Sequence, residues 1–546
     1  MKVAEAVGRA LHAAGIEQVF GVVGSGNFHL TNALVAAGAR FVAARHEGGA
    51  ATMADAYARV RGTVAAVSVH QGPGLTNAMT GITEAAKSRT PLLVLAAEVT
   101  RPTSNFYVDQ EALARAVGAV PMRITSAEDA VGQSCEAVRR ALHERCTVVL
   151  NLPLDVQESD VPDGALAQAS PPPRRPAVVP TGSEVAALVR VLEQARRPVF
   201  VAGRGARSPA ARDALEALAE RCGALPATSA VARGLFHDNP WSLDVSGGFA
   251  TPVAAELIGG ADVIVGWGCA LNMWTVRHGT LIGADTSVLQ VDDDPSALGA
   301  HRELHLGVTG DVELTARQAL EAFGGRQEGL RTHEIAEALA TRGRWRDVPY
   351  EDTSTRDRID PVTLSIALDD ILPAERVVGV DSGNFMGHPS MFLSVPDQDG
   401  FCFTQAYQSI GLGLATTIGA ALARPDRLPV AALGDGGALM GAADLETVRR
   451  LGLPMVVVVY NDDAYGAEVH HFGPDGHPLD TVEFPPTDIA AVARGYGFEA
   501  VTVRTRTDLK AVEDWVAGPR SAPLLIDAKV VRDRGAWWLE EAFRGH

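Results

Sequence analysis

Short apolar runs that stop at glycine or aspartate, each followed by residues with helical periodicity, recur along the whole chain. In the clearest case, the apolar run 429–433 stops at a glycine-rich turn, and apolar residues then return on one helical face from Leu439 to Leu451. Gly452 ends this helix, and the β-branched run 455–460 predicts a strand that is covered on both sides. A strand, a helix and a second buried strand in this order predict a βαβ crossover with two parallel strands.

The same succession predicts three α/β domains, each with a doubly wound, mostly parallel sheet. We expect these domains at residues 1–168, 177–323 and 357–546. The proline-rich segment 171–176 predicts a stiff linker after the first domain, and the polar segment 324–355 predicts a second linker before the third.

The two outer domains share a weak internal repeat. Gly74 and Pro91 have the same spacing of 17 residues as Gly437 and Pro454, each pair inside a strand, glycine turn, helix and strand. Two similar folds at the two ends of the chain are therefore expected. The predicted strands lie at residues 19–23, 41–44, 64–69, 92–97, 199–202, 263–267, 288–291, 429–433, 455–460 and 524–528.

Composition and charge narrow the function classes. The 546 residues are 47% hydrophobic and 21% charged, as in ordinary globular proteins, and the length needs several cores. A net charge of −18 argues against binding to nucleic acid or to an anionic membrane. The chain shows neither an apolar run long enough for a membrane span nor a leader segment, and its five cysteines form no CxxC pair. We therefore expect a cytoplasmic protein without zinc or disulfides.

Two carboxylates suggest the chemistry. Asp435 and Asp462 each follow one of the two predicted parallel strands, so both lie at the edge where α/β sheets bind ligands. Held about 4 Å apart, they would repel by roughly 4 kcal/mol, whereas the neighbouring glycine turn exposes backbone N–H groups that suit phosphate. A divalent cation such as Mg²⁺ resolves this conflict. The alternative is that two turns happen to contain aspartate.

The spacing of these residues resembles the thiamine diphosphate motif. Gly434-Asp435-Gly436 is followed by Asn461-Asp462, with 27 positions between the two aspartates. The resemblance implies that Asp435, Asp462 and the carbonyl of Ala464 bind Mg²⁺, which holds the cofactor's diphosphate. This chain has Asp462 where asparagine is commoner, which changes the usual balance of charge. Further residues in contact with the cofactor are then Gly436, Gly437, Ala438, Tyr465 and Gly466.

A second segment, which begins Arg45-His46-Glu47, resembles the RHExxA segment of the acetolactate synthase, pyruvate decarboxylase and benzaldehyde lyase family. The resemblance implies that Glu47 hydrogen-bonds the pyrimidine ring and exchanges a proton with it, which a buried carboxyl group can do. The alternative is an acidic residue in the first helical turn that the helix dipole favours. The outer domains are then a pyrimidine-binding domain and a diphosphate-binding and Mg²⁺-binding domain.

Two more turns fit the same resemblance. Ile410, in the segment 408–413, corresponds to the apolar wedge under the folded cofactor, with an ordinary core isoleucine as the rival interpretation. Ser382 and Asn384 correspond to contacts of the diphosphate. In the central domain the turn 203–206 is similar to a nucleotide-binding turn but lacks the third glycine, so bound FAD is considered and not favoured.

The residues that would decide the fate of the substrate favour two different reactions. Gln110, like the turn 71–77, matches carboligases of the acetolactate synthase type, whereas Glu468 matches an acid of pyruvate decarboxylases. His70, His470 and His471 add proton-transfer groups, and His70, next to the glycine turn, is the preferred catalytic candidate. For each histidine a solvated or packed role is about as well supported.

We therefore expect a thiamine diphosphate and Mg²⁺ enzyme that decarboxylates a small 2-oxo acid, pyruvate first, and ligates the acyl carbanion to a second carbonyl. The alternatives are release of an aldehyde by simple decarboxylation and, more remotely, a non-catalytic nucleotide-binding protein on the same fold. The resemblance also implies a homodimer or homotetramer whose active sites are shared between subunits.

Overall fold

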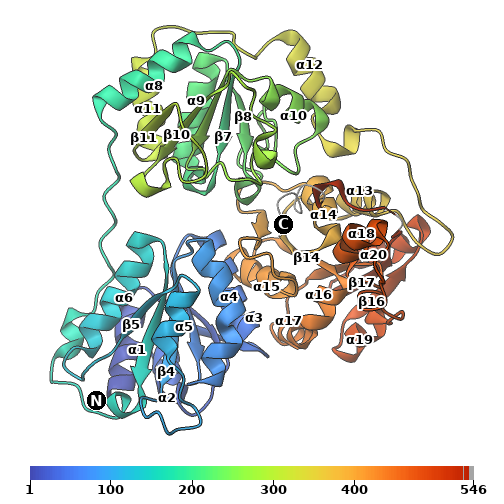
Figure 1. Cartoon of the computed structure of the whole chain (residues 1–546). Helices are drawn as coiled ribbons and strands as arrows, with labels where there is room; N and C mark the ends of the chain where they lie inside the picture. Colours follow the sequence, from blue (N-terminus) through green and yellow to red (C-terminus); the bar gives the residue numbers. More distant parts are fainter. Residues whose placement is uncertain (533, 540–546) are drawn as a thin grey trace.

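The computed structural model describes residues 1–532 and 534–539, which fold into three α/β units (Figure 1). Each unit contains one sheet, and every paired strand in the described sheets is parallel. Helices cover both faces of the sheets, so the predicted α/β class with three parallel-sheet domains is confirmed.

The first sheet has the strand order β2-β1-β3-β4-β6-β5. Its strands are β1 (Gln18–Gly21), β2 (Arg40–Ala43), β3 (Ala65–Val69), β4 (Leu92–Glu98), β5 (Val120–Arg123) and β6 (Thr147–Pro153). Its helices are α1 (Val3–Ala13), α2 (Phe28–Ala37), α3 (Glu47–Arg61), α4 (Pro73–Lys87), α5 (Gln110–Ala116), α6 (Ala130–Glu144) and α7 (Leu154–Gln157).

The second sheet has the order β11-β10-β9-β7-β8. Its strands are β7 (Pro198–Ala202), β8 (Leu225–Thr228), β9 (Val263–Trp267), β10 (Ser287–Asp292) and β11 (Leu306–Thr309), and the helices are α8 (Gly182–Gln194), α9 (Pro209–Cys222), α10 (Pro252–Gly259) and α11 (Val312–Ala322). The short strands β8 and β11 were not among the predicted strands. The predicted second linker contains a helix, α12 (His333–Arg342).

The third sheet has the order β13-β12-β14-β15-β17-β16. Its strands are β12 (Arg376–Val380), β13 (Phe401–Phe403), β14 (Leu428–Gly434), β15 (Val456–Asn461), β16 (Glu499–Val503) and β17 (Leu524–Lys529). Its helices are α13 (Pro361–Ile371), α14 (Gly387–Phe392), α15 (Gly413–Ala423), α16 (Asp435–Met440), α17 (Leu445–Arg450), α18 (Gly466–Phe472), α19 (Ile489–Gly495) and α20 (Lys510–Ala517).

The prediction of one continuous helix from residue 439 to residue 451 is wrong. A 3₁₀ turn, Ala442–Asp444, separates α16 from α17. Leu445 and Val448 are buried as expected, but Leu439 is 43% exposed. The helical period is interrupted, so Leu439 no longer shares a buried face with the later residues.

The first and third domains pack face to face through α3 and α15. The contact is so close that a Cβ atom on Gly419 would lie 2.1 Å from the carbonyl oxygen of Met53. Apolar residues of both domains form one continuous core across this contact. The two sheets therefore meet through helices on their faces.

Polar contacts show that the two domains are antiparallel. Arg450, at the end of α17 and near the amino edge of the third sheet, donates to the carbonyl of Ala43, at the carboxyl edge of the first sheet. Conversely, Arg59, near the end of α3, donates to the carbonyl of Phe403, at the carboxyl edge of the third sheet, over 3.1 Å. The carboxyl edges of the two sheets consequently face in opposite directions within one chain.

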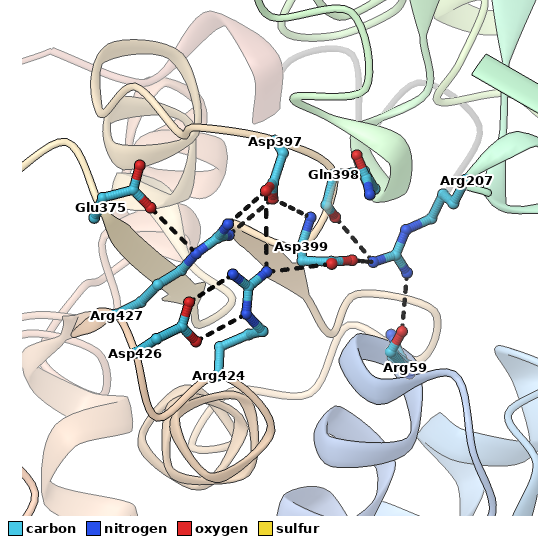
Figure 2. A network of polar contacts seen from close by, with 9 residues as sticks. All are labelled: Arg59, Arg207, Glu375, Asp397, Gln398, Asp399, Arg424, Asp426 and Arg427. Carbon is cyan, nitrogen blue, oxygen red and sulfur yellow. Dashed lines mark hydrogen bonds and ion pairs between the residues drawn. The ribbon is translucent and has the colours of Figure 1, made fainter. Parts of the chain in front are cut away.

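One arginine ties all three domains together (Figure 2). Arg207 of the central domain donates to the carbonyl of Arg59 over 3.0 Å and to the carbonyl of Gln398 over 2.9 Å, and it also pairs with Asp399 at 3.1 Å. Asp399 in turn accepts from Arg424 of the third domain at 3.3 Å. The network fixes the central domain at the end of the α3–α15 contact.

The α3–α15 contact makes Gly419 a sensitive position. We expect Gly419→Ala to lower the free energy of unfolding by roughly 1–3 kcal/mol, because the added methyl group overpacks a backbone contact. Chemical denaturation followed by circular dichroism measures the change. The matched control is Gly495→Ala at the end of α19, where a Cβ atom would meet nothing within 4 Å. Equal stability of the two variants would show that the helices can separate without cost.

Candidate active site

The carboxyl edge of the third sheet brings Asp435 and Asp462 together. Gly434 at the end of β14 is paired with Tyr460 near the end of β15, so the residues that follow each strand are neighbours. Both aspartates are only 8% exposed. Burial raises the pKa of Asp435 to about 6, and burial together with the charge of Asp435 raises the pKa of Asp462 well above its usual range.

This carboxylate pair fits a divalent cation. Arg358 is a basic residue near this pair, but it forms its ion pair with Asp463, the residue after Asp462, at 2.5 Å. Among the described residues no group of three or more His, Cys, Asp or Glu side chains could hold a metal ion. A cation between Asp435 and Asp462 would therefore complete its shell with a carbonyl such as that of Ala464, a diphosphate and water. Mg²⁺ accepts this mixed set of oxygen ligands.

Three glycines keep this edge open. A Cβ atom on Gly436 would lie 2.6 Å from the ring of Tyr465, and one on Gly466 would lie 2.2 Å from a carboxylate oxygen of Asp462. On Gly437 it would lie 2.2 Å from Asp381. Glycine therefore lets the start of α16, the turn after β15 and the turn after β12 approach each other.

Asp381 is a site residue whose role the sequence analysis did not assign. Its buried carboxylate accepts hydrogen bonds from the backbone N–H groups of Ser382, Gly411 and Leu412 at 2.9, 3.0 and 3.2 Å. Burial raises the pKa of Asp381 to about 6. An aspartate directly after a strand at the same sheet edge was the available signal. Through these hydrogen bonds Asp381 fastens the loop that carries Ile410 to the end of β12.

The structure thus gathers the C-terminal half-site, by which we mean the turns after β12, β14 and β15 together with the loop before α15. It contains most of the predicted residues: Ser382, Asn384, Ile410, Asp435, Gly436, Gly437, Ala438, Asp462, Ala464, Tyr465, Gly466 and Glu468. Glu468 lies in the first turn of α18. The side chain of Asn384 also accepts a hydrogen bond from the backbone of Ala536, at 3.2 Å, so the C-terminal segment supports this turn.

The N-terminal half-site lies at the carboxyl edge of the first sheet. Glu47 is the first residue of α3, and its carboxylate accepts a hydrogen bond from the side chain of Asn77 at 3.1 Å. His70 follows β3, and its Nδ1 accepts from the backbone of Gly26 at 3.3 Å. Burial lowers the pKa of His70 despite the opposing effect of Glu47, so at neutral pH its imidazole carries a proton on Nε2 and can donate from there.

Gln110 has contacts that the sequence analysis did not anticipate. Its side chain is 2% exposed. The amide oxygen accepts from the backbone N–H of Gly72 at 3.3 Å, and the amide nitrogen donates to Asn151 at 2.8 Å. Gln110 therefore supports the glycine turn before α4 from behind, and its amide is already hydrogen-bonded on both sides.

The two half-sites do not face each other in one chain. Glu47 lies at the carboxyl edge of the first sheet. This edge is next to Asp444, at the end of the 3₁₀ turn that follows α16, because the backbone N–H of Arg45 donates to Asp444 over 3.0 Å. Asp435 lies at the other end of this stretch, where α16 begins at the carboxyl edge of the third sheet. A pocket that uses both half-sites requires a second copy of the chain.

A cavity of about 500 Å³ lies where the three domains meet. The central domain lines it with residues such as Arg204 and Ser229, the first domain with residues such as Lys87, and the third with residues such as Phe403 and Gln408. In the turn that precedes it, a Cβ atom on Gly203 would lie 2.3 Å from the carbonyl of Gly268. This backbone contact alone explains the glycine, without a bound nucleotide. The preference for a structural central domain over one that binds FAD stays a prediction.

Comparisons with known proteins address the family directly. Residues 1–118, 185–319 and 381–528 match the N-terminal TPP binding, central and C-terminal TPP binding domains of thiamine pyrophosphate enzymes. A probable 2-ketoarginine decarboxylase of Pseudomonas aeruginosa is 32% identical over 93% of this chain and 90% of its own length. The chain belongs to the thiamine pyrophosphate enzyme family.

Other members of the thiamine pyrophosphate enzyme family are similar over nearly the whole chain. A sulfoacetaldehyde acetyltransferase of Rhodobacter capsulatus is 28% identical over 98% of this chain and 95% of its own. An acetolactate synthase large subunit of Parasynechococcus marenigrum is 26% identical over 97% of this chain and 87% of its own. The fold matches a thiamine diphosphate-dependent 4-hydroxybenzoylformate decarboxylase of Rhodococcus jostii RHA1, with a TM-score of 0.82 and 23% identity over 98% of this chain and 100% of that chain.

The structure also bears on two expected absences. Among the described residues no helix is long and apolar enough to cross a membrane. All five cysteines have free thiols, and Cys222, Cys269 and Cys402 are buried. Burial raises the pKa of each of these three thiols. They behave as small core residues.

The carboxylate pair predicts how the C-terminal half-site responds to mutation. Asp435→Ala should weaken thiamine diphosphate binding in the presence of Mg²⁺ by at least roughly 100-fold, because even residues that only support metal ligands contribute 10–100-fold. Asp462→Asn should have a mild effect, since an amide oxygen can still bind the metal and one uncompensated charge is removed. Isothermal calorimetry measures both affinities. Unchanged affinity in Asp435→Ala would show that the metal lies elsewhere.

Proposed function

We propose that this chain is a thiamine diphosphate and Mg²⁺ enzyme that decarboxylates a small 2-oxo acid, pyruvate first, and ligates the acyl unit to a second carbonyl compound. The observation that carries the proposal is Glu47. It is a carboxylate at a ligand-binding sheet edge, held by Asn77 and close enough to His70 to act on the pKa of that imidazole. A protein that only binds nucleotides on this fold would not need such a group, which makes the non-catalytic alternative remote.

The residues of the C-terminal half-site divide the work of holding the cofactor. Asp435, Asp462 and the carbonyl of Ala464 would bind Mg²⁺, and the start of α16 would bind the diphosphate with its backbone N–H groups. Ser382 and Asn384 would add polar contacts, and Ile410 would support the cofactor from below. When bound, thiamine diphosphate supplies the nucleophilic carbon and accepts the electron pair released with CO₂.

The N-terminal half-site would supply proton transfer and a shaped pocket. Glu47 is placed to exchange a proton with the cofactor's ring nitrogen. His70 would donate a hydrogen bond from Nε2 to the substrate. Gln110, whose amide is bound to Gly72 and Asn151, would act by fixing the glycine turn in front of it. A reducing, cytoplasmic setting fits the five free thiols.

Shared active sites follow from the proposal. The two half-sites lie at oppositely directed sheet edges, so a homodimer, or a homotetramer of two dimers, would pair each half-site with that of the partner chain. Exposed apolar side chains mark both half-sites and suit such a contact. Each is between 39% and 56% exposed: Val23, Phe28, Phe106, Tyr107, Leu439, Met440, Phe472 and Phe484.

Simple decarboxylation to an aldehyde is the second candidate. Glu468 in the first turn of α18 is an acid that could protonate the bound product, and one relative at 32% identity carries the name of a probable decarboxylase. Two other relatives carry the names of a synthase and an acetyltransferase. We favour ligation because the 71–77 turn, supported by Gln110, follows the carboligase pattern.

Product analysis separates the two candidates. The enzyme is supplied with pyruvate, with and without a panel of aldehydes and 2-oxo acids, and acetaldehyde is quantified against acyloin and acetolactate by NMR. We expect a ligated product to dominate when an acceptor is present. Acetaldehyde as the main product with every acceptor would establish the decarboxylase. The control is Glu47→Gln, which should lower turnover by roughly 10²–10⁴-fold with either product.

A further inference from the structure

The loop between β13 and α15, residues 404–412, has an unusual backbone. Gln408 has φ of 60°, in the left-handed region that residues other than glycine seldom adopt, and Gly411 has φ of 88°. Ile410 lies between these two residues. Such a conformation persists only when its surroundings fix it, and Asp381 fixes the Gly411 end.

The other end of the loop is held by the first domain of the same chain. Glu84, near the end of α4, accepts hydrogen bonds from the backbone N–H groups of Ala406 and Tyr407 at 3.1 and 2.6 Å. The ammonium group of Lys87 lies 5.7 Å from the centre of the Tyr407 ring. The loop that carries Ile410 is thus fastened at one end to Asp381 and at the other to Glu84.

Glu84 is itself fully buried and held as an anion. Arg59 donates to its carboxylate over 2.8 Å, and Ser88 donates over 3.2 Å. Burial acts to raise the pKa of Glu84, but Arg59 and the two backbone N–H groups outweigh burial and lower it below its usual value. Charge-assisted hydrogen bonds are stronger than those between neutral groups. Moving the loop away from Glu84 would therefore cost the free energy of two such bonds.

We propose that Glu84 is a positioning residue for the cofactor: by fixing the backbone at Ala406 and Tyr407 it sets the place of Ile410 in the C-terminal half-site. The inference rests on the proposed use of that half-site for thiamine diphosphate. It gives the first domain two roles. Its carboxyl edge offers Glu47 to the partner chain's site, and its amino edge supports the site of its own chain. The single helix α4 reaches from the glycine turn at Pro73 to Glu84.

The test is Glu84→Gln, which keeps the shape of the side chain but removes its charge and replaces one of its two acceptor oxygens with an NH₂ group that opposes a backbone N–H. Binding of thiamine diphosphate with Mg²⁺ is measured by calorimetry, and the unfolding midpoint of the cofactor-free protein is measured alongside. We expect the affinity to fall by about 10-fold or more, as for the loss of charge-assisted hydrogen bonds.

The matched control is Asp369→Asn. Asp369 is also a helix carboxylate that binds a buried arginine, Arg376, and a loop N–H, that of Ser394 at 2.8 Å. It lies at the amino edge of the third sheet, away from the half-site. We expect Asp369→Asn to lower the unfolding midpoint as much as Glu84→Gln does and to leave cofactor affinity unchanged. Equal affinities in both variants and in the wild type would overturn the proposal.

Hydrogen exchange tests the same proposal without a variant. The amides of Ala406 and Tyr407 should be protected in the cofactor-free wild-type protein, because Glu84 already binds them, and Glu84→Gln should remove the protection of at least one of them. Free exchange of both amides in the wild type would contradict the proposal even if Glu84→Gln does not fold. A wild-type protein that binds no thiamine diphosphate would instead reject the proposed function, and the two failures are distinct.

Discussion

The packing of α3 against α15 is the constraint on which the rest of this structure depends. Gly419 lets the two helices meet backbone to backbone, and the first and third domains then share one apolar core. The domains are antiparallel, so each sheet offers its carboxyl edge on the side where the other offers its amino edge. The edges that carry the two half-sites do not meet within the chain, so the proposed site, which uses both, needs a second copy of the chain.

The same packing explains how buried charges are distributed. At the joint, Arg59 pairs with both Asp55 and Glu84, at 2.6 and 2.8 Å, and all three side chains are almost completely buried. These carboxylates have a cation beside them. Asp435 and Asp462 at the carboxyl edge face each other instead. Burial raises the pKa of both, and the charge of Asp435 adds to the rise for Asp462. Arg59 thus balances the charges of Asp55 and Glu84 within the protein, whereas a bound cation would balance those of Asp435 and Asp462 in the proposed site.

Local signals were enough to predict most of this fold. Strands that stop at glycine and aspartate marked the carboxyl edge of the third sheet, and the βαβ order predicted that Asp435 and Asp462 lie together there. The break at Ala442–Asp444 could not be read from the sequence, because the apolar period continues through it. Gln110 matches a family pattern, but its buried amide donates to Asn151, a contact across 41 positions that no motif predicts.

Glu84 is the clearest case of a contact that could not be predicted from the sequence. It sits in an ordinary helical stretch, and the backbone groups that it binds lie 322 and 323 positions away. No spacing or motif connects them, and only the face-to-face packing of the two domains brings them into contact. The proposed division of an active site between two chains is likewise a property of domain orientation, which composition and periodicity do not encode.

Mixing two inactive variants tests the shared site most directly. Glu47→Gln chains and Asp435→Ala chains are purified, combined under conditions that exchange subunits, and assayed with pyruvate. If one half-site comes from each chain, mixed dimers contain one intact site, and random exchange should restore about a quarter of wild-type activity. If both half-sites come from the same chain, mixed dimers confirmed by mass spectrometry will be no more active than either variant alone, and the account is wrong.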